Sequence, residues 1–228
     1  LAARSIKKMK SLANELHSHF KVNVIVISAD LEINGGATTL HADIKARGIR
    51  LNALVNNAGY GLVGQFEQYS FEDNQKMMQV NMHALVEMCQ KFYPYLVGKG
   101  QAYVLNIASS TAYQAIPNMS LYAATKVFVL NFSRGLYHEW KAKGISVTVV
   151  SPGATTTNFN DRANLQEKAR KAAEKVTMTP ATVAKLAVDG MFAKKIEVIT
   201  GMVNKLGAFL AWVAPKAISE KIAKGIYE

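Results

Sequence analysis

Short apolar runs rich in β-branched residues recur along the chain, and small or polar residues follow each of them. The clearest runs are Val22 to Ser28, Leu51 to Val55, Ala102 to Ile107 and Ile145 to Val150. Runs of this length and apolarity are typical of strands that are buried on both faces of a parallel sheet. Longer segments with apolar residues at three- and four-residue spacing separate them and indicate helices. The alternation predicts an α/β fold with a doubly wound parallel sheet.

The expected helices combine apolar spacing with recognisable end signals. Ser5 is placed to cap a helix that runs to Phe20, and Gly48 and Gly144 each follow the end of a later helix. Pro94 is expected to bend or end its helix near the last turn. The expected elements are helices at Ser5 to Phe20, Ala37 to Arg47, Phe71 to about Val97, Ser120 to Lys143, Asp161 to Lys175 and Pro180 to Ala193, and a last strand at Ile196 to Thr200.

The length of 228 residues suits one large domain, and the sequence shows neither an internal repeat nor a linker. We expect a single domain over residues 1–200, with residues 201–228 as an amphipathic helical extension of it. Apolar residues from Met202 to Ile226 alternate there with four lysines. A basic amphipathic segment of this kind can lie on an anionic membrane, cover an apolar substrate, or pack against the domain or a symmetric partner.

Lysine and arginine number 27 against 16 acidic residues, which gives a formal charge of +11. This charge suits polyanions such as a phosphorylated cofactor, an anionic lipid or nucleic acid. The basic residues are dispersed rather than interleaved with aromatics in a stripe, so nucleic acid is not an expected partner. The histidines show no metal-ligand spacing, and no metal site is expected.

The single cysteine, Cys89, cannot form an internal disulfide, and this favours a reducing compartment such as the cytoplasm. No apolar run approaches the length of about 18 residues that a membrane-spanning helix needs.

Tyr122 and Lys126 lie four residues apart near the start of a predicted helix, so their side chains project from one face. A nearby ammonium favours the phenolate and lowers the pKa of a tyrosine from about 10. Tyr122 could then act as a general acid and base near neutral pH. Ser109, at the end of the preceding strand, could fold its hydroxyl beside Tyr122 and hold a carbonyl oxygen.

Further residues accompany this pair in a fixed order. They are Asn56-Asn57-Ala58-Gly59 after one strand, Asn81 inside the next helix, Ser109 after the following strand, and Pro152-Gly153 after the strand beyond. With these motifs the sequence resembles the short-chain dehydrogenase/reductase family over essentially the whole chain. The resemblance implies a Rossmann-like fold and hydride transfer between a nicotinamide cofactor and a carbonyl or alcohol.

The resemblance also implies a role for each matched residue. Tyr122 would transfer the proton, Ser109 would orient the substrate oxygen, and Lys126 would bind the nicotinamide ribose. Asn81 would hold a water that links Lys126 to solvent. Cofactor contacts are implied for Asp30 at the adenine, for Asn56, Ala58 and Gly59, and for Pro152, Gly153 and Thr157 near the nicotinamide amide.

The choice of cofactor can be argued from Ala3 and Arg4. In the family, an acid often ends the second strand when the cofactor is NAD, because it accepts hydrogen bonds from the ribose. Ala3 stands at this position, and the guanidinium of Arg4 can pair with a 2′-phosphate. NADP is therefore expected rather than NAD. The alternative is that Arg4 is only a charged residue at a helix start, where the helix dipole disfavours it.

The glycine-rich phosphate loop of the family, Thr-Gly-x-x-x-Gly-x-Gly, would precede Leu1 and is not in residues 1–228. We expect one of two cases. Either the first strand, the loop and the first helix precede this chain, or they are absent and the chain is a fragment without cofactor affinity. The stretch from Gly59 to Gly64 fits G-x-G-x-x-G, but no helix opens there. Its glycines are instead expected to let the backbone pass close to the ribose.

The leading hypothesis is an NADP-dependent oxidoreductase that acts on a small apolar carbonyl or alcohol. We expect a cytoplasmic homodimer or homotetramer, assembled through the two long helices. Peripheral membrane contact through residues 201–228 is one alternative, and packing of this segment against the domain or a partner is the other. The tail resembles that of a bacterial branch of the family. The alternative is a non-catalytic protein on the same fold that senses the cofactor or interacts at a membrane.

Overall fold

The computed structural model describes residues 1–156 and 177–227, and strands and helices alternate along them as expected. The strands are β1 (Ala2–Ala3), β2 (Ile27–Ser28), β3 (Ala53–Asn56), β4 (Ala102–Ile107), β5 (Ile145–Ser151) and β6 (Glu197–Ile199). The helices are α1 (Ile6–Phe20), α2 (Gly36–Ala46), α3 (Phe71–Met78), α4 (Ala84–Leu96), α5 (Ser120–Lys141), α8 (Pro180–Phe192), α9 (Met202–Val213) and α10 (Lys216–Tyr227). Short 3-10 turns lie at η1 (Phe66–Gln68) and η3 (Ser110–Tyr113), and a π-helical turn lies at η2 (Gln79–His83).

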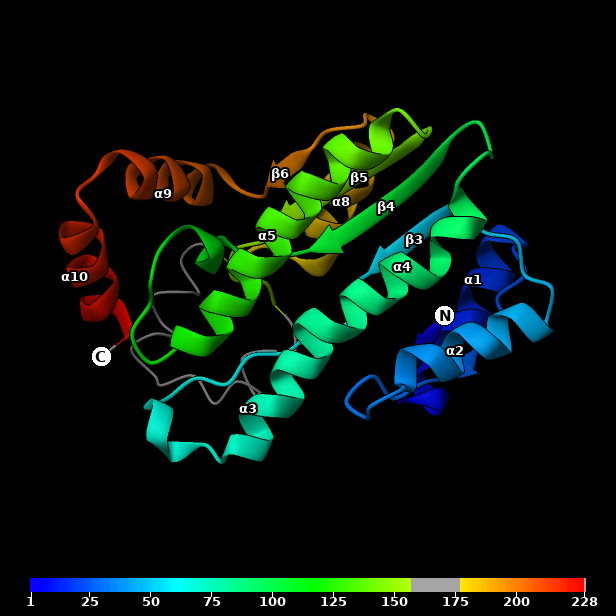
Figure 1. Cartoon of the computed structure of the whole chain (residues 1–228), viewed down its shortest axis with the longest axis horizontal. Helices are drawn as coiled ribbons and strands as arrows, with labels where there is room; N and C mark the ends of the chain where they lie inside the picture. Colours follow the sequence, from blue (N-terminus) through cyan, green and yellow to red (C-terminus); the bar gives the residue numbers. More distant parts are fainter. Residues whose placement is uncertain (157–176, 228) are drawn as a thin grey trace.

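The strands pair in parallel and form two sheets. One has the order β3-β4-β5-β6, and the other pairs β1 with β2 (Figure 1). Helices α4 and α5 pack on one face of the larger sheet and α8 packs on the other. The prediction of a parallel α/β sheet with helices on both faces is therefore confirmed.

The core lies between the larger sheet and its helices. Every residue of β5 is buried, and Val104 of β4 faces Val147 of β5 in register. These side chains pack with Phe92 of α4 and Val129 of α5, and all four are fully buried. The continuous apolar runs of the sequence correspond to these two central strands.

The strand expected at Val22 to Ser28 is shorter than predicted, because only Ile27–Ser28 pairs. A strand extends only where a partner supplies hydrogen bonds, and β1 offers only Ala2–Ala3. Val22 is 44% exposed and Ile25 is 38% exposed, so the prediction that both faces of this run are buried was wrong.

Strand β3 also differs from the expected picture of a strand buried on both faces. Val55 is 52% exposed, although its neighbour Leu54 is buried. Among the described residues, β3 has β4 as its partner and no strand on its other edge.

The long helix expected from Phe71 to about Val97 consists of α3 and α4, which the π-helical turn η2 separates. Pro94 lies inside α4, and the helix ends at Leu96 as expected. Ser5 precedes α1, but its side chain makes no capping hydrogen bond. The helix expected at residues 161–175 lies outside the described residues.

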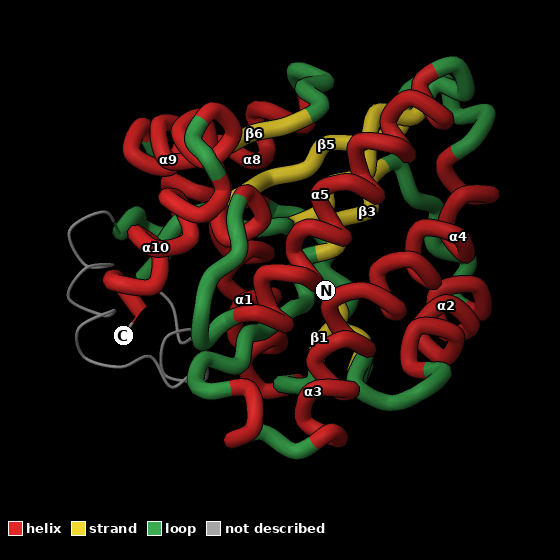
Figure 2. The backbone as a smooth tube through the Cα atoms, turned by 60° about the vertical axis from the view of Figure 1, so that its left-hand side comes forward, coloured by secondary structure: helices red, strands yellow, loops and turns green. Residues whose placement is uncertain are grey.

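Helices α9 and α10 follow β6 and form an outer corner of the molecule, beyond one end of the sheet (Figures 1 and 2). Pro215 lies between them, as the sequence indicated. Within the described part of the chain, no helix has the length and apolarity needed to cross a bilayer.

Candidate active site

Tyr122 and Lys126 lie in the first two turns of α5 and are almost fully buried, with exposures of 6% and 5%. The Nζ atom of Lys126 lies 5.8 Å from the centroid of the Tyr122 ring and donates a hydrogen bond to the carbonyl oxygen of Ile107 at 2.9 Å. Ile107 ends β4. The start of α5 and the end of β4 are thus joined by this lysine, and the predicted pairing of Tyr122 with Lys126 is present.

Burial lowers the pKa of Lys126 from 10.5 to about 8, because desolvation disfavours the ammonium. A pKa of about 8 still leaves most of the side chain protonated at neutral pH. Lys126 therefore presents a positive charge, poorly screened by water, beside Tyr122.

Asn81 lies in the π-helical turn η2 and is 1% exposed. Its Oδ1 accepts a hydrogen bond from the backbone N–H of Tyr60 at 3.1 Å, and its Nδ2 donates to the carbonyl oxygen of Tyr60 at 2.9 Å. The Nδ2 also donates to Oγ1 of Thr125 at 3.0 Å. Asn81 thus clamps the loop after β3 against α5.

Thr125 is a member of this network that the sequence analysis missed. It is 1% exposed, and its hydroxyl accepts from Asn81 and donates to the carbonyl oxygen of Tyr122 at 2.7 Å. Thr125 precedes Lys126 in the motif, and the spacing of Tyr122 and Lys126 alone gave no signal for it.

Ser109 follows β4 and is 8% exposed. Its Oγ accepts a hydrogen bond from the backbone N–H of Thr111 at 3.2 Å and so caps η3. A serine hydroxyl that accepts one bond keeps its own hydrogen for donation. Ser109 is therefore held at a strand end in a form that can bind a carbonyl oxygen.

Gly59 passes directly beside two of these side chains. A Cβ atom at this position would lie 3.1 Å from Oδ1 of Asn81 and 3.3 Å from Nζ of Lys126. Ala58 and Gly59 are exposed, so this backbone forms an open surface over the buried pair. The next helical turns begin at Phe66 and Phe71, so the G-x-G-x-x-G stretch opens no helix, as expected.

Asn56, unlike Ala58 and Gly59, turns its side chain into the protein. Its Nδ2 donates to Oδ1 of Asn106 at 2.9 Å and to Sγ of Cys89 at 3.4 Å. The structure therefore does not bring the Asn56 side chain to the exposed surface formed by Ala58 and Gly59. Its contacts tie β3 to β4 and α4.

Pro152 and Gly153 follow β5 and are partly buried. The carbonyl oxygen of Pro152 accepts from the backbone N–H of Ser110 at 2.7 Å, which places this motif beside Ser109. Gly153 contacts the side chain of Asn204 so closely that a Cβ atom would lie 2.1 Å from Nδ2. Thr157 lies outside the described residues.

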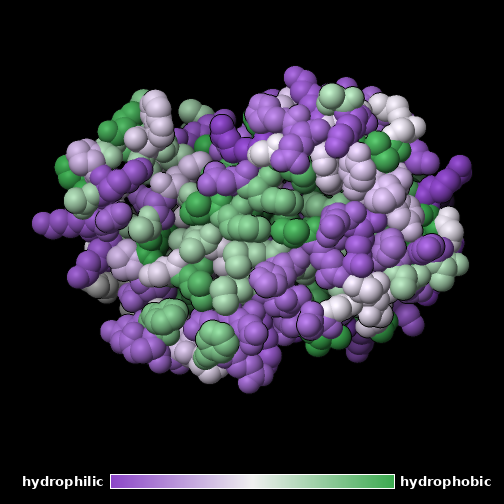
Figure 3. All heavy atoms as spheres, in the orientation of Figure 1, coloured by the Kyte–Doolittle hydropathy of each residue, from purple (hydrophilic) through white to green (hydrophobic). Residues whose placement is uncertain are grey.

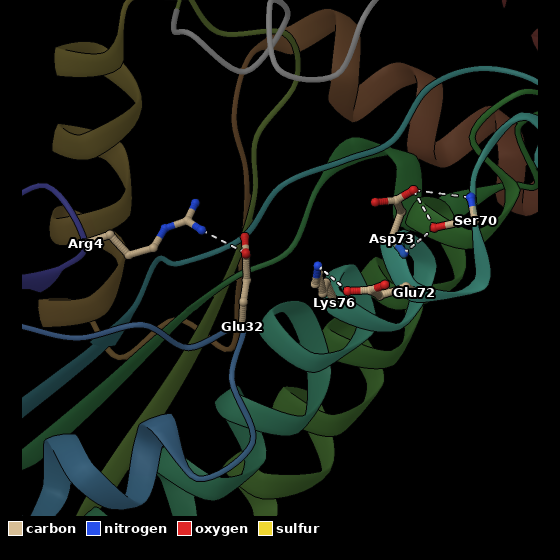
Figure 4. A network of polar contacts seen from close by, with 6 residues as sticks. All are labelled: Arg4, Glu32, Ser70, Glu72, Asp73 and Lys76. Atoms are coloured by element: carbon tan, nitrogen blue, oxygen red, sulfur yellow. Dashed lines mark hydrogen bonds and ion pairs between the residues drawn. The ribbon is translucent and has the colours of Figure 1, made fainter.

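Arg4 and Asp30 follow the paired strands β1 and β2, so they lie at the same edge of that sheet. The guanidinium of Arg4 forms an ion pair with Glu32, with Nη1 and Oε2 2.8 Å apart, and the two side chains point toward each other (Figure 4). The Arg4 side chain is 47% exposed. Asp30 Oδ1 accepts from the backbone N–H of Glu32 at 2.9 Å.

Apolar side chains pack around Tyr122. The cluster comprises Tyr60, Val63, Met77, Val80, Ile116, Met119, Tyr122 and, from α10, Ala223. A small hollow beside it is lined by Leu62, Gly64, Phe66, Tyr69, Asn74, Met77, Asn118, Met119, Ser120 and Leu121. In the described ranges, no group of histidine, cysteine and acidic residues could hold a metal ion.

Comparisons with known proteins agree with this geometry. A family profile described as short chain dehydrogenase matches residues 1–168. A very-long-chain 3-oxoacyl-CoA reductase-B of Danio rerio is 32% identical over 168 residues, covering 70% of this chain and 52% of the relative. The chain thus spans about half the length of the curated relatives it matches. This relative is a vertebrate protein, so it does not test the expected resemblance of the tail to a bacterial branch of the family. That resemblance stays a prediction.

Solved structures share the fold over nearly the whole chain. A 7beta-hydroxysteroid dehydrogenase superposes with a TM-score of 0.85 at 22% identity, covering 97% of this chain and 85% of that chain. A short-chain dehydrogenase from Sphingobium yanoikuyae, solved with NADPH, has a TM-score of 0.80 at 26% identity, covering 95% and 86%. With the profile match over residues 1–168 and the clustering of Asn81, Tyr122 and Lys126, the chain belongs to the short-chain dehydrogenase family.

Proposed function

We propose that this protein is an NADP-preferring oxidoreductase that interconverts an apolar carbonyl compound and its alcohol. The observation that carries the proposal is the buried pair of Tyr122 and Lys126, with Nζ 5.8 Å from the ring centroid. A buried phenol beside a buried ammonium suits proton transfer to or from a substrate oxygen.

The residues present fit a nicotinamide cofactor at its ribose and nicotinamide end. Gly59 leaves open the position where a side chain would press on Asn81 and Lys126. Lys126 would hold the ribose hydroxyls, and the backbone of Ala58 and Gly59 would lie along the ribose. Pro152 and Gly153 would lie beside the nicotinamide. When bound, the nicotinamide supplies the hydride.

The remaining chemistry belongs to side chains of this chain. Ser109 donates its hydroxyl hydrogen to the substrate oxygen and orients it. In the reducing direction, Tyr122 transfers the proton of its hydroxyl to that oxygen. The ammonium of Lys126 then stabilises the phenolate that forms, and low local dielectric strengthens this attraction.

The preference for NADP rests on Arg4. This guanidinium lies at the end of β1, and an arginine can pair with a 2′-phosphate in a bidentate way. Its present partner is the carboxylate of Glu32. Asp30 would contact the adenine from the neighbouring strand.

The apolar cluster around Tyr122 supports an apolar substrate. The relative from Danio rerio bears the name of a 3-oxoacyl-CoA reductase, and a fold neighbour that of a hydroxysteroid dehydrogenase. Long-chain 3-oxoacyl thioesters and ketosteroids are therefore the first substrates to compare.

We also propose a homodimer or homotetramer in the cytoplasm. Apolar residues gather at the centre of the face that α4 and α5 occupy (Figure 3). Phe128 of α5 is 38% exposed and stacks on Phe132. Sedimentation equilibrium would show whether the protein forms a dimer or a tetramer. The free thiol of Cys89 is buried and supports a reducing compartment.

The decisive experiment measures oxidation of NADPH with a panel of apolar ketones and 3-oxoacyl thioesters. For the full chain we expect Tyr122→Phe to lower kcat by at least about a thousandfold, because the proton donor is lost. Binding of NADPH, measured by fluorescence titration, should stay within about twofold. Tyr137→Phe, near the far end of the same helix, is the matched control and should keep full activity.

Equal turnover by wild type and Tyr122→Phe would contradict the mechanism. Binding of NADPH without turnover of any compound in the panel would instead favour the alternative function, a cofactor-sensing or membrane-associated interaction protein. The exposed apolar residues of α9 and α10 are the observation that keeps this alternative open.

A further inference from the structure

Helix α9 turns its large apolar side chains away from the molecule. The outward residues, with their exposures, are Met202 (76%), Val203 (61%), Leu206 (58%), Phe209 (57%), Leu210 (49%) and Val213 (51%). Their spacing of three and four places them on one side of the helix. Ala208 and Ala211 lie on the other side and are buried. A helix that packs on a globular domain normally faces its large apolar residues inward, so the outward stripe of α9 is a candidate docking surface.

Positive charge and an exposed tryptophan flank the stripe. Trp212 is 79% exposed. Lys205 lies on α9, and Nζ of Lys216 donates to the carbonyl oxygen of Ala211, which holds this ammonium at the end of α9. Lys221 on α10 is exposed. The space-filling view shows hydrophobic and hydrophilic residues side by side at this end of the molecule (Figure 3).

Helix α10 continues the surface and also reaches the candidate active site. Ile218 and Ile222 are exposed, at 54% and 62%. Ala223, on the opposite side, is 1% exposed and packs in the cluster that contains Tyr122. If a surface bound the exposed side of α9 and α10, only α10 would therefore separate it from the cluster that contains Tyr122.

Two kinds of occupant fit an apolar stripe, namely a second copy of the chain and a lipid surface. A symmetric second copy would bring the same lysines near one another, in a protein that already carries a formal charge of +11. An anionic bilayer accepts the apolar stripe at its acyl boundary, the lysines at its headgroups and a tryptophan between the two. Charge complementarity therefore favours the lipid.

We propose that the outward face of α9, with Trp212 and the lysines beside it, binds the surface of an anionic bilayer. The helix would lie in the plane of the interface. The proposal does not depend on the oxidoreductase function, because binding to lipid needs neither cofactor nor turnover.

The test is co-sedimentation of the full chain with vesicles. Vesicles of phosphatidylglycerol and phosphatidylcholine in equal parts should bind the protein at least tenfold more tightly than phosphatidylcholine alone, and added salt should weaken this binding. The double variant Leu206→Glu/Phe209→Glu should bind at least tenfold more weakly. Phe71→Glu removes an apolar residue of similar exposure (77%) from α3 and should leave binding unchanged.

Two further measurements guard against misfolding and against a different occupant. The chain has two tryptophans, and Trp140 is buried, so a blue shift of emission on adding vesicles reports on Trp212. Lys205→Gln/Lys221→Gln, which leaves the apolar stripe intact, should bind anionic vesicles several-fold more weakly.

Equal binding to both kinds of vesicle, or none to either, would overturn the proposal. So would a dimer that Leu206→Glu/Phe209→Glu dissociates, because the stripe would then bind a second copy. Loss of turnover in Tyr122→Phe with unchanged vesicle binding would support both proposals separately.

Discussion

The two ends of the candidate cofactor site differ in how firmly their side chains are held. Around Tyr122, the side chains of Asn81 and Lys126 are buried, and backbone or buried hydroxyl groups accept their hydrogen bonds. At the other end, Arg4 is half exposed and is held by an ion pair with Glu32. The Glu32 side chain is only 18% exposed, but water reaches the pair through Arg4, and ion pairs open to water contribute little, about 0 to 1 kcal/mol. The reacting end is therefore preorganised, whereas the end that would select the cofactor can be altered at little structural cost.

If the buried end is preorganised by Asn81, removing that side chain should have the largest effect on stability. Asn81→Ala leaves the N–H and carbonyl of Tyr60 and the hydroxyl of Thr125 without this partner. Loss of a buried hydrogen bond costs about 1 to 3 kcal/mol, so we expect the free energy of unfolding to fall by about 3 to 4 kcal/mol for the three bonds together. Urea unfolding measures it, and the exposed Asn131→Ala on α5 is the control. A loss no larger than that of the control would show that the clamp is not structural.

The buried ammonium of Lys126 should make stability depend on pH. Its pKa is about 8 in the folded protein and near 10.5 when unfolded, so between these values the unfolded chain binds more protons. Wild-type stability should therefore rise with pH across this window, relative to Lys126→Met, by about 2 to 3 kcal/mol. Parallel pH profiles for the two proteins would mean that Lys126 is not buried as a titrating group.

At the exposed end of the candidate cofactor site, replacing Arg4 should change the affinity for the cofactor rather than the stability of the fold. Arg4→Ala should weaken the binding of NADPH about tenfold, or by about 1.4 kcal/mol, because only NADPH carries the 2′-phosphate. The binding of NADH should be unchanged. Stability should change by less than about 1 kcal/mol. Titration with both cofactors decides the point, since an equal loss for each would assign Arg4 a structural role.

Replacing Glu32 should give the smallest change in NADPH affinity, and this change should be an increase. Glu32→Gln frees Arg4 from its ion pair and removes a negative charge near the proposed phosphate position. We expect NADPH to bind about two- to threefold more tightly, with the gain diminishing at high salt. Asp43→Asn, which breaks the ion pair with Arg47 on α2, is the matched control. Tighter binding of NADH by the same factor would argue against a phosphate at this position.

The sequence predicted the central elements well because their signals are local. The boundaries of β4 agree with the expected Ala102 to Ile107, and those of α5 differ only at its end. The pairing of Tyr122 with Lys126 follows from helical spacing alone. Strand β2 was predicted too long, because the extent of a strand depends on its partner and not on its own apolarity.

Two features of the site depend on contacts between distant residues and could not be predicted from one sequence. Asn56 turns inward because Asn106 and Cys89, far along the chain, offer it partners. Thr125 joins the site because Asn81, 44 residues earlier in the chain, donates a hydrogen bond to it from η2. The expected contact of Thr157 lies outside the described residues and stays a prediction.

The π-helical turn at Gln79–His83 acts as a phase shift between two apolar faces. A single extra residue in a helix rotates everything beyond it by about 100°. Before the turn, Met77 faces the cluster around Tyr122, and after it Cys89 and Phe92 face the core of the sheet. Helices α3 and α4 thereby contribute to two clusters, the one around Tyr122 and the core of the sheet. Deleting one residue within the turn would therefore misalign one of these faces, even if the backbone on both sides of the turn stayed helical.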